Sequence, residues 1–217
     1  FFLASGQTLD LELIFRDDAA LSQYKLDIHS NFDCHGHARA STIDWSVLEV
    51  IDLEGTEQAV SRSLLVPERA TAGAYHFQVQ VIDASGNEDP FANYYDIVIT
   101  NVQDSLPPEL MVTAPSENSL TVNKGGSLRF AGSVADNQPL GEGGNGRLLL
   151  TYQRADSDNL FEAHEVVWEA DQGDRATFDF EFEVPQTLVA GTYRFVLSAF
   201  DGVNNESESK EFRVMVE

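Results

Sequence analysis

The sequence has a single cysteine, so no disulfide can form within the chain. It has no run of about 18 consecutive apolar residues, which excludes a membrane-spanning helix. Basic residues are also scarce: 13 Lys and Arg stand against 36 Asp and Glu, which gives a net charge of −23. A chain this acidic repels phosphate backbones and anionic headgroups. We therefore expect no nucleic-acid partner and no direct binding of the chain to anionic lipid headgroups.

Catalytic and nucleotide-binding signatures are missing as well. There is no Gly-x-Ser-x-Gly motif to mark a hydrolase nucleophile. The glycine-rich stretch 141–146 precedes a predicted strand and lacks the Lys-Ser/Thr ending of a phosphate loop. The carboxylates are too numerous to single out a catalytic pair. We therefore expect that the protein is not an enzyme. A metalloenzyme is the least favoured of three functional hypotheses.

Short segments in which apolar and polar residues alternate dominate the sequence, and no amphipathic helix stands out. In residues 74–82, Tyr75, Phe77 and Val79 share one face, and His76 and Gln78 share the other. Many short strands with turn signals between them are typical of a β-sandwich. The chain is therefore predicted to be all-β. Further strands are expected at 22–29, 94–98, 128–130, 148–152, 178–182 and 212–216.

The pattern occurs twice. Residues 72–79 (AGAYHFQV) match residues 190–197 (AGTYRFVL), and each segment is followed by an aspartate and an Asn-containing turn. Two prolines after Leu106 indicate a short, stiff linker. We predict two tandem Ig-like β-sandwich domains, 1–104 and 105–217. Domain 1 has few residues before its first match to domain 2, so its first strand is expected to be absent from this sequence.

Histidines concentrate in the stretch 26–37, which includes His29, His35 and His37. In an Ig-like sandwich, strands C and F are antiparallel neighbours. Taking 22–29 as C and 74–82 as F places His29 beside His76, both facing outward and within about 5 Å. The loop after strand C would then bring the other two histidines over the same spot.

Three or four imidazoles form a competent site for a transition metal, with zinc or copper as the expected ion. The predicted ligands are His29, His35, His37 and His76. Asp33 would ligate the ion or orient a histidine. Cys34 is a candidate soft ligand, although it is adjacent to His35 and neighbouring side chains rarely both face one ion. The alternative is that these histidines only form hydrogen bonds.

Domain 2 serves as an internal control for this site. Aligning the repeats places Gln153 where domain 1 has His29 and Arg194 where it has His76. We therefore expect domain 2 to be a spacer or docking module without the metal site. His164 is expected to be a packing or surface residue. The acidic stretches 83–89 and 201–206 are candidate calcium loops, but hairpin turns with Gly and Asn at positive φ are the preferred interpretation.

The motif 28–37 (IHSNFDCHGH), followed by 73–77 (GAYHF) and 83–87 (DASGN), resembles a Bacteroidota family catalogued as domain of unknown function 4625. Cys34 departs from the family pattern, in which a glycine is expected. The resemblance covers domain 1 and implies an exported Ig-like lipoprotein at the cell envelope or surface. It also implies that membrane contact, expected at the outer membrane, occurs only through a lipid anchor upstream of this sequence. It implies no established activity.

These observations give one leading hypothesis and one main rival. The first is a surface metal-binding protein that acts beside an outer-membrane transporter or another envelope protein. The rival is a structural or adhesive tandem module in which outward faces dock a partner and no residue is catalytic.

Overall fold

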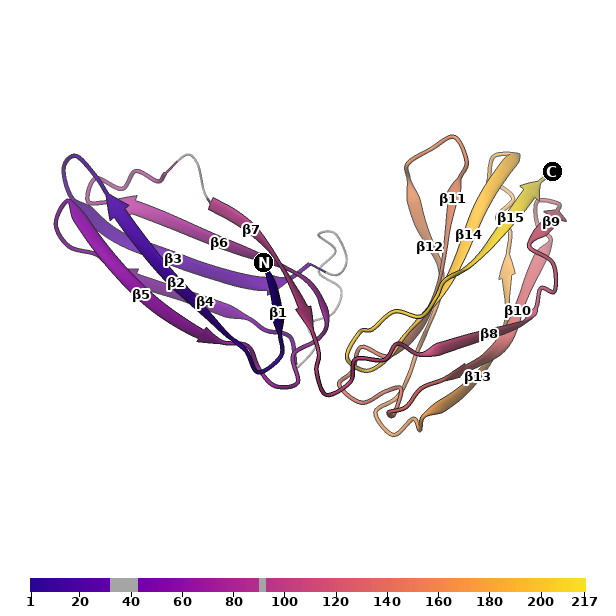
Figure 1. Ribbon diagram of the computed structural model, residues 1–217. Coiled ribbons are helices and arrows are strands. Elements are labelled where there is room, and N and C mark those ends of the chain that lie inside the picture. The colour runs from indigo at the N-terminus through magenta and orange to yellow at the C-terminus, as the bar shows by residue number, and fades with distance from the viewer. Residues whose placement is uncertain (32–42, 90–92) are drawn as a thin grey trace. The chain divides into compact units, whose positions relative to one another are not determined.

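The computed structural model describes residues 1–31, 43–89 and 93–217. These residues form strands and loops, and the described part of the chain has no helix suited to crossing a membrane. The chain divides into two compact units, Phe1–Ser105 and Leu106–Glu217, each with its own hydrophobic core (Figure 1). The prediction of an all-β chain built from Ig-like sandwiches is confirmed.

Unit 1 packs a five-stranded sheet against a two-stranded one. The larger sheet has the order β1-β7-β6-β3-β4, with β1 parallel to β7 and the other pairs antiparallel. Its strands are β1 (Phe2–Ala4), β7 (Asn93–Thr100), β6 (Gly73–Asp83), β3 (Leu21–Ser30) and β4 (Val47–Asp52). The smaller sheet pairs β2 (Thr8–Arg16) with β5 (Glu57–Leu65).

Unit 2 repeats this topology. Its larger sheet has the order β12-β11-β14-β15-β9, and its smaller sheet has the order β13-β10-β8. The strands are β8 (Glu109–Ala114), β9 (Ser119–Val122), β10 (Ser127–Ala135), β11 (Arg147–Arg154), β12 (Leu160–Val167), β13 (Arg175–Glu183), β14 (Gly191–Phe200) and β15 (Lys210–Val216). Strand β8 borders β10, whereas β2 pairs only with β5 among the described residues.

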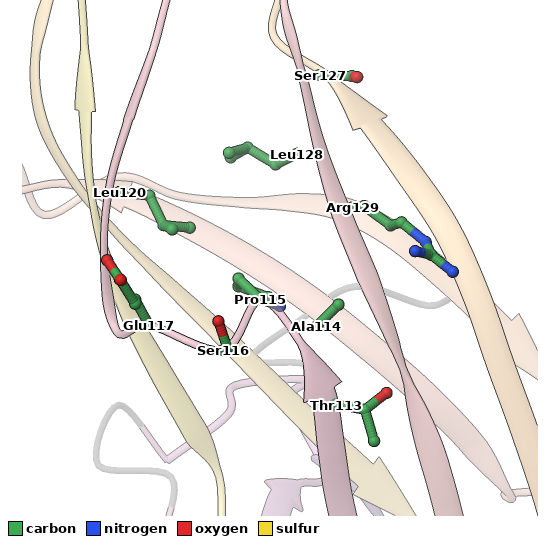
Figure 2. A pocket seen from close by; sticks show the side chains of 9 residues that line it. All are labelled: Thr113, Ala114, Pro115, Ser116, Glu117, Leu120, Ser127, Leu128 and Arg129. Atoms are coloured by element: carbon green, nitrogen blue, oxygen red, sulfur yellow. The ribbon is translucent and has the colours of Figure 1, made fainter.

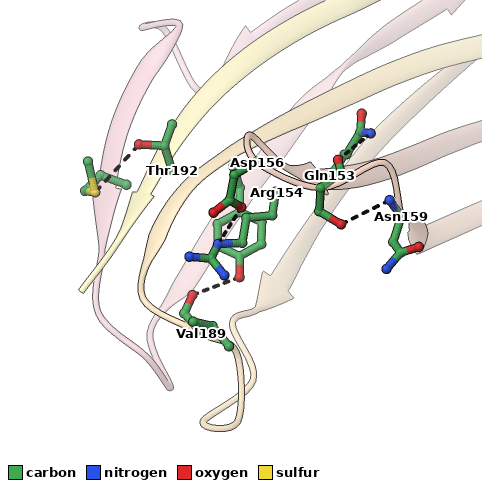
Figure 3. Close-up of polar contacts among 9 residues, drawn as sticks. Gln153, Arg154, Asp156, Asn159, Val189 and Thr192 are labelled. Atoms are coloured by element: carbon green, nitrogen blue, oxygen red, sulfur yellow. Dashed lines mark hydrogen bonds and ion pairs between the residues drawn. The ribbon is translucent and has the colours of Figure 1, made fainter.

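Strict alternation explains why β3 and β6 form the centre of unit 1. Leu26 and Ile28 of β3 and Tyr75 and Phe77 of β6 are buried, and the residues between them face outward. The Tyr75 hydroxyl donates to Thr71 O at 2.9 Å and closes a tyrosine corner, a contact typical of Ig-like sandwiches. Unit 2 repeats this contact, in which the Tyr193 hydroxyl donates to Val189 O at 2.8 Å (Figure 3).

A glycine begins the repeated strand in both units for a conformational reason. Gly73 has φ +128° and Gly191 has φ +148°, a region that residues with a Cβ rarely adopt. The backbone turns here so that the following tyrosine enters the core. The backbone conformation thus favours glycine at this position of both repeats.

Candidate functional site

Two histidines, His29 and His76, face each other across β3 and β6, and we call them the histidine pair. They are direct register partners, with ring centroids 5.7 Å apart and ring planes at 82°. Because Ile28 and Phe77 are buried, alternation turns both imidazoles outward. The side chains are 53% and 27% exposed, respectively. The predicted strand pairing and outward orientation are confirmed, whereas metal binding stays a prediction.

Two aspartates that we did not predict accompany the pair. Asp27 lies two residues before His29, with Oδ1 3.0 Å from His29 Nδ1 and Oδ2 2.8 Å from Lys25 Nζ. Burial raises the pKa of Asp27, but its hydrogen bonds to Lys25 and His29 outweigh burial and hold that pKa below its usual value. Asp96 of β7 is the register partner of His76, with Oδ1 4.0 Å from His76 Nε2.

The sequence features that could have revealed these two aspartates differ. Asp27 is on the same face of the same strand as His29, so the alternation of β3 was enough to find it. Asp96 reaches the site only through the register of β7 against β6, which its own sequence does not specify.

The other predicted ligands, His35 and His37, and the accessory residues Asp33 and Cys34 lie outside the described residues. Within 1–31, 43–89 and 93–217, no group of three or more His, Cys, Asp or Glu side chains is arranged to hold a metal ion. The histidine pair alone supplies two nitrogen ligands, and structural zinc sites usually take four.

Residues 2–100 match the family model of a domain of unknown function (DUF4625). This is the family that the motif resembles, so the resemblance is confirmed over these residues. The DUF4625 match includes both strands of the histidine pair, and Leu106–Glu217 lies outside it. No curated protein shows significant similarity to the chain.

Three solved structures illustrate the likeness of the whole chain. The fibronectin(III)-like modules of CbhA from Clostridium thermocellum are 11% identical, cover 100% of this chain and 88% of that chain, and give a TM-score of 0.36. A tetra-tandem repeat from the extending region of a large adhesion protein is 16% identical, with 98% and 46% covered and a TM-score of 0.39. Dimeric latent PorU from Porphyromonas gingivalis is 14% identical, with 100% and 22% covered and a TM-score of 0.36. These values indicate a loose likeness only.

Unit 2, which lies outside the DUF4625 match, has different side chains at the position that corresponds to the histidine pair. Gln153 of β11 is the register partner of Arg194 of β14, as the alignment of the two repeats predicted. Arg194 is in turn the partner of Arg213 of β15, which takes the place of Asp96. Arg213 was not predicted, because β15 was placed only as a strand and not in register.

Two grooves lie on unit 2. One has a volume of about 480 Å³ and includes Thr192, Arg194 and Arg213 in its lining. The other, of about 390 Å³, lies where β8 ends and the chain crosses to β9, with Pro115 and Leu120 beside Leu128 of β10 (Figure 2). Among the residues that line the second groove, Arg129 is basic (Figure 2). It forms an ion pair with Asp179 of β13.

The two acidic turns have the geometry of hairpin turns. Asp83 Oδ1 accepts hydrogen bonds from the backbone N–H groups of Ser85 and Asn87, and Asn87 Nδ2 donates to its Oδ2 at 2.7 Å. Gly86 has φ +87°, as expected for this turn. The hydrogen bonds from the Asn87 side chain and backbone lower the pKa of Asp83. Donors of the same turn thus occupy both carboxylate oxygens of Asp83.

The remaining predicted residue, His164, is a packing residue. Its ring stacks on Phe180 with centroids 4.1 Å apart. Large apolar side chains instead face outward on unit 1, where Tyr94 of β7 is 69% exposed and Leu48 of β4 is 68% exposed. They lie in one register row with Gln78 and Asp27, and Gln78 Nε2 donates to the Tyr94 hydroxyl at 2.9 Å.

Proposed function

We propose that the protein is a non-catalytic tandem Ig-like interaction module, with a structural or adhesive role at the cell surface. One observation carries this proposal: the larger sheets of the two units have corresponding strand orders but present different side chains at the same outward position. Unit 1 has the histidine pair with Asp96, and unit 2 has Gln153, Arg194 and Arg213.

Folding does not require this difference. The core positions of the two repeats correspond, because Tyr75 and Tyr193 form the same corner and Phe77 and Phe195 are both buried. Outward side chains contribute little to a sandwich core, so their chemistry is free to follow a binding role. Exposed Tyr94 and Leu48 add apolar contact area of the kind that partners bury.

We also propose that the module is exported and displayed on the cell envelope, with a lipid anchor supplied upstream and an envelope protein, such as an outer-membrane transporter, as its partner. The DUF4625 match over residues 2–100 supports this placement, because a resemblance to this family implies an exported lipoprotein. The charge of −23 is consistent with a solvated surface protein.

Photo-crosslinking in the producing cells tests the interaction role. A photoreactive amino acid replaces Tyr94 on the larger sheet of unit 1, and a matched variant carries it at Ile14, which is also exposed but lies on the smaller sheet. We expect a discrete protein adduct from position 94 and none from position 14. Equal adducts from both positions, or none from either, would contradict the proposal.

Metal binding is the second candidate function, favoured by the direct opposition of His29 and His76. With ligands from His35, His37, Asp33 or Cys34, the pair would complete a zinc or copper site. Tag-free protein purified without added metal should contain nearly one equivalent of metal by mass spectrometry. His29→Ala/His76→Ala should lose it, and Gln153→Ala/Arg194→Ala should retain it. Metal-free protein that also fails to bind zinc, copper or nickel at micromolar concentration would exclude this function.

The metal affinity should also depend on pH. A metal binds the neutral imidazole, so protons compete with the metal for every histidine ligand. Affinity should therefore fall by tenfold or more between pH 7.5 and pH 5.5, measured by competition with a chelator whose own pH dependence is known. Equal affinity at both pH values would show that histidine is not the ligand.

A further inference from the structure

The basic residues of this acidic chain are mostly paired with carboxylates. Arg16 pairs with Glu57, Arg62 with Glu49, and Arg129 with Asp179. The outer face of β14 and β15 is different, because Arg194 and Arg213 are direct cross-strand partners. Like charges in this position are unfavourable in the absence of an anion.

One carboxylate only partly balances the two arginines. Glu211 of β15 forms an ion pair with Arg194. Arg213 is exposed and has no ion-pair partner in the part of the chain that the structure describes. The three side chains together leave an excess of one positive charge, which suits one carboxylate better than a doubly charged phosphate.

These side chains line the 480 Å³ groove, and the volume falls within the range of small-molecule sites. Asn118 and Thr192 add neutral polar groups to the lining. The surroundings are held by local contacts: Arg154 Nε lies 3.0 Å from Asp156 Oδ1, and Thr192 Oγ1 donates to Met215 Sδ at 4.0 Å (Figure 3).

The position of the groove within the sheet restricts the class of ligand. Strand β14 lies between β11 and β15, and β15 lies between β14 and β9, so the sheet uses their backbone hydrogen-bonding groups. An extended peptide would need such groups to add as a strand. A ligand here must be recognised by side chains, and a guanidinium binds a carboxylate through two parallel hydrogen bonds.

We propose that the groove binds a sugar acid, with its carboxylate on the Arg213 guanidinium and its hydroxyl groups on Thr192, Asn118 and Glu211. This inference rests on the proposal that outward faces of the sandwich are binding surfaces, and it assigns a ligand class to the face of unit 2. It concerns the position in unit 2 that corresponds to the histidine pair in unit 1.

Calorimetric titration of the full chain tests the proposal with glucuronate, glucose and inorganic phosphate as probes. Glucose matches glucuronate except for the carboxylate. We expect glucuronate to bind with a millimolar dissociation constant, glucose not to bind, and phosphate to bind at least tenfold more weakly than glucuronate. Equal binding of glucose, or tighter binding of phosphate, would overturn the assignment.

Three variants locate the site. Arg213→Gln should weaken glucuronate binding at least tenfold. Arg213→Lys should weaken it less, because the positive charge remains while the two parallel hydrogen bonds of the guanidinium are lost. The control Arg129→Gln removes an arginine of the smaller sheet and should leave binding unchanged. Circular dichroism checks that each variant is folded. Unchanged binding by folded Arg213→Gln would refute the site.

A further arm distinguishes the source of the ligand. Methyl glucuronide carries the same carboxylate but is capped like the terminal residue of a glycan. Binding of both forms would indicate a glycan end, and binding of the free acid alone would indicate a soluble sugar acid. Since these titrations use purified protein, their failure is distinct from a failure of the crosslinking test on unit 1.

Discussion

At the residue scale, Asp27 links the histidine pair to the stability of unit 1. Its carboxylate contacts Lys25 Nζ and His29 Nδ1 on an outward face that folding leaves polar. Because its pKa is lowered in the folded state, its stabilising effect is complete above the unfolded pKa of about 3.9. That effect is lost as the pH falls through the lower, folded value.

Asp27→Asn should therefore destabilise unit 1 by about 0.5–1 kcal/mol at pH 7, the range of a partly exposed ion pair. The difference from the wild type should shrink toward zero as the pH falls below about 3.9. Trp45 is the only tryptophan of unit 1, so its fluorescence in a Trp168→Phe background reports this unfolding. Asp52→Asn, on the same face of the sheet, is the control for the loss of one carboxylate. A difference that stays constant down to pH 3 would contradict the assignment.

At the element scale, the two turns after β6 and β14 have the same contacts in different surroundings. Asp201 Oδ1 accepts from Val203 N at 2.9 Å and from Asn205 N at 2.8 Å, as Asp83 does with Ser85 and Asn87. Asp201 is buried, whereas the residues that follow Asp83 in its turn are exposed. Water can replace the carboxylate only in the exposed turn.

Asp201→Ala should therefore cost unit 2 about 2–4 kcal/mol, because it leaves buried N–H groups without an acceptor. Asp83→Ala should cost unit 1 clearly less. Denaturant unfolding followed by Trp168 in a Trp45→Phe background measures the first effect, and the reverse background measures the second. Equal losses would show that burial of the turn does not matter.

The sequence predicted several strands in which apolar and polar residues alternate strictly, although it missed β2, which alternates as well. It also missed strands in which the alternation breaks. Strands β3 and β6 were predicted because every second residue is apolar and enters the core. In β5 the inward positions include Gln58 and Arg62, which hide the period. In β12 the register shifts opposite Leu150 and Thr151, so apolar residues change phase along the strand.

The residues of the candidate site also divide into those that the sequence predicted and those that it did not. The histidine pair followed from alternation together with the antiparallel neighbours of an Ig-like sheet. Asp96 and Arg213 did not follow, since each depends on the register of a further strand, β7 or β15. Register is set by turns and by packing across the sheet, which the residues of a single strand do not reveal.

At the scale of the whole molecule, the net charge of −23 acts over longer distances than the side chains of the histidine pair and of the unit 2 groove. The acidic surface sets which macromolecules approach, and it disfavours polyanions. Beyond about 8 Å, salt at physiological concentration screens these charges, whereas a guanidinium in contact with a carboxylate is screened much less. An acidic protein can therefore bind a small acid at one local site while excluding nucleic acid.

The two units should also fold independently of each other. Each has its own cluster of buried residues, and Phe1–Ser105 and Leu106–Glu217 both have the length of an ordinary domain. Separate fragments 1–105 and 106–217 should each unfold cooperatively, with midpoints within a few degrees of the same unit in the full chain. Trp45 and Trp168 report one unit each, so thermal unfolding of the single-tryptophan full-length variants provides the reference values. A fragment that stays unfolded, or a midpoint lowered by ten degrees or more, would mean that the units stabilise each other and that the chain works as one body.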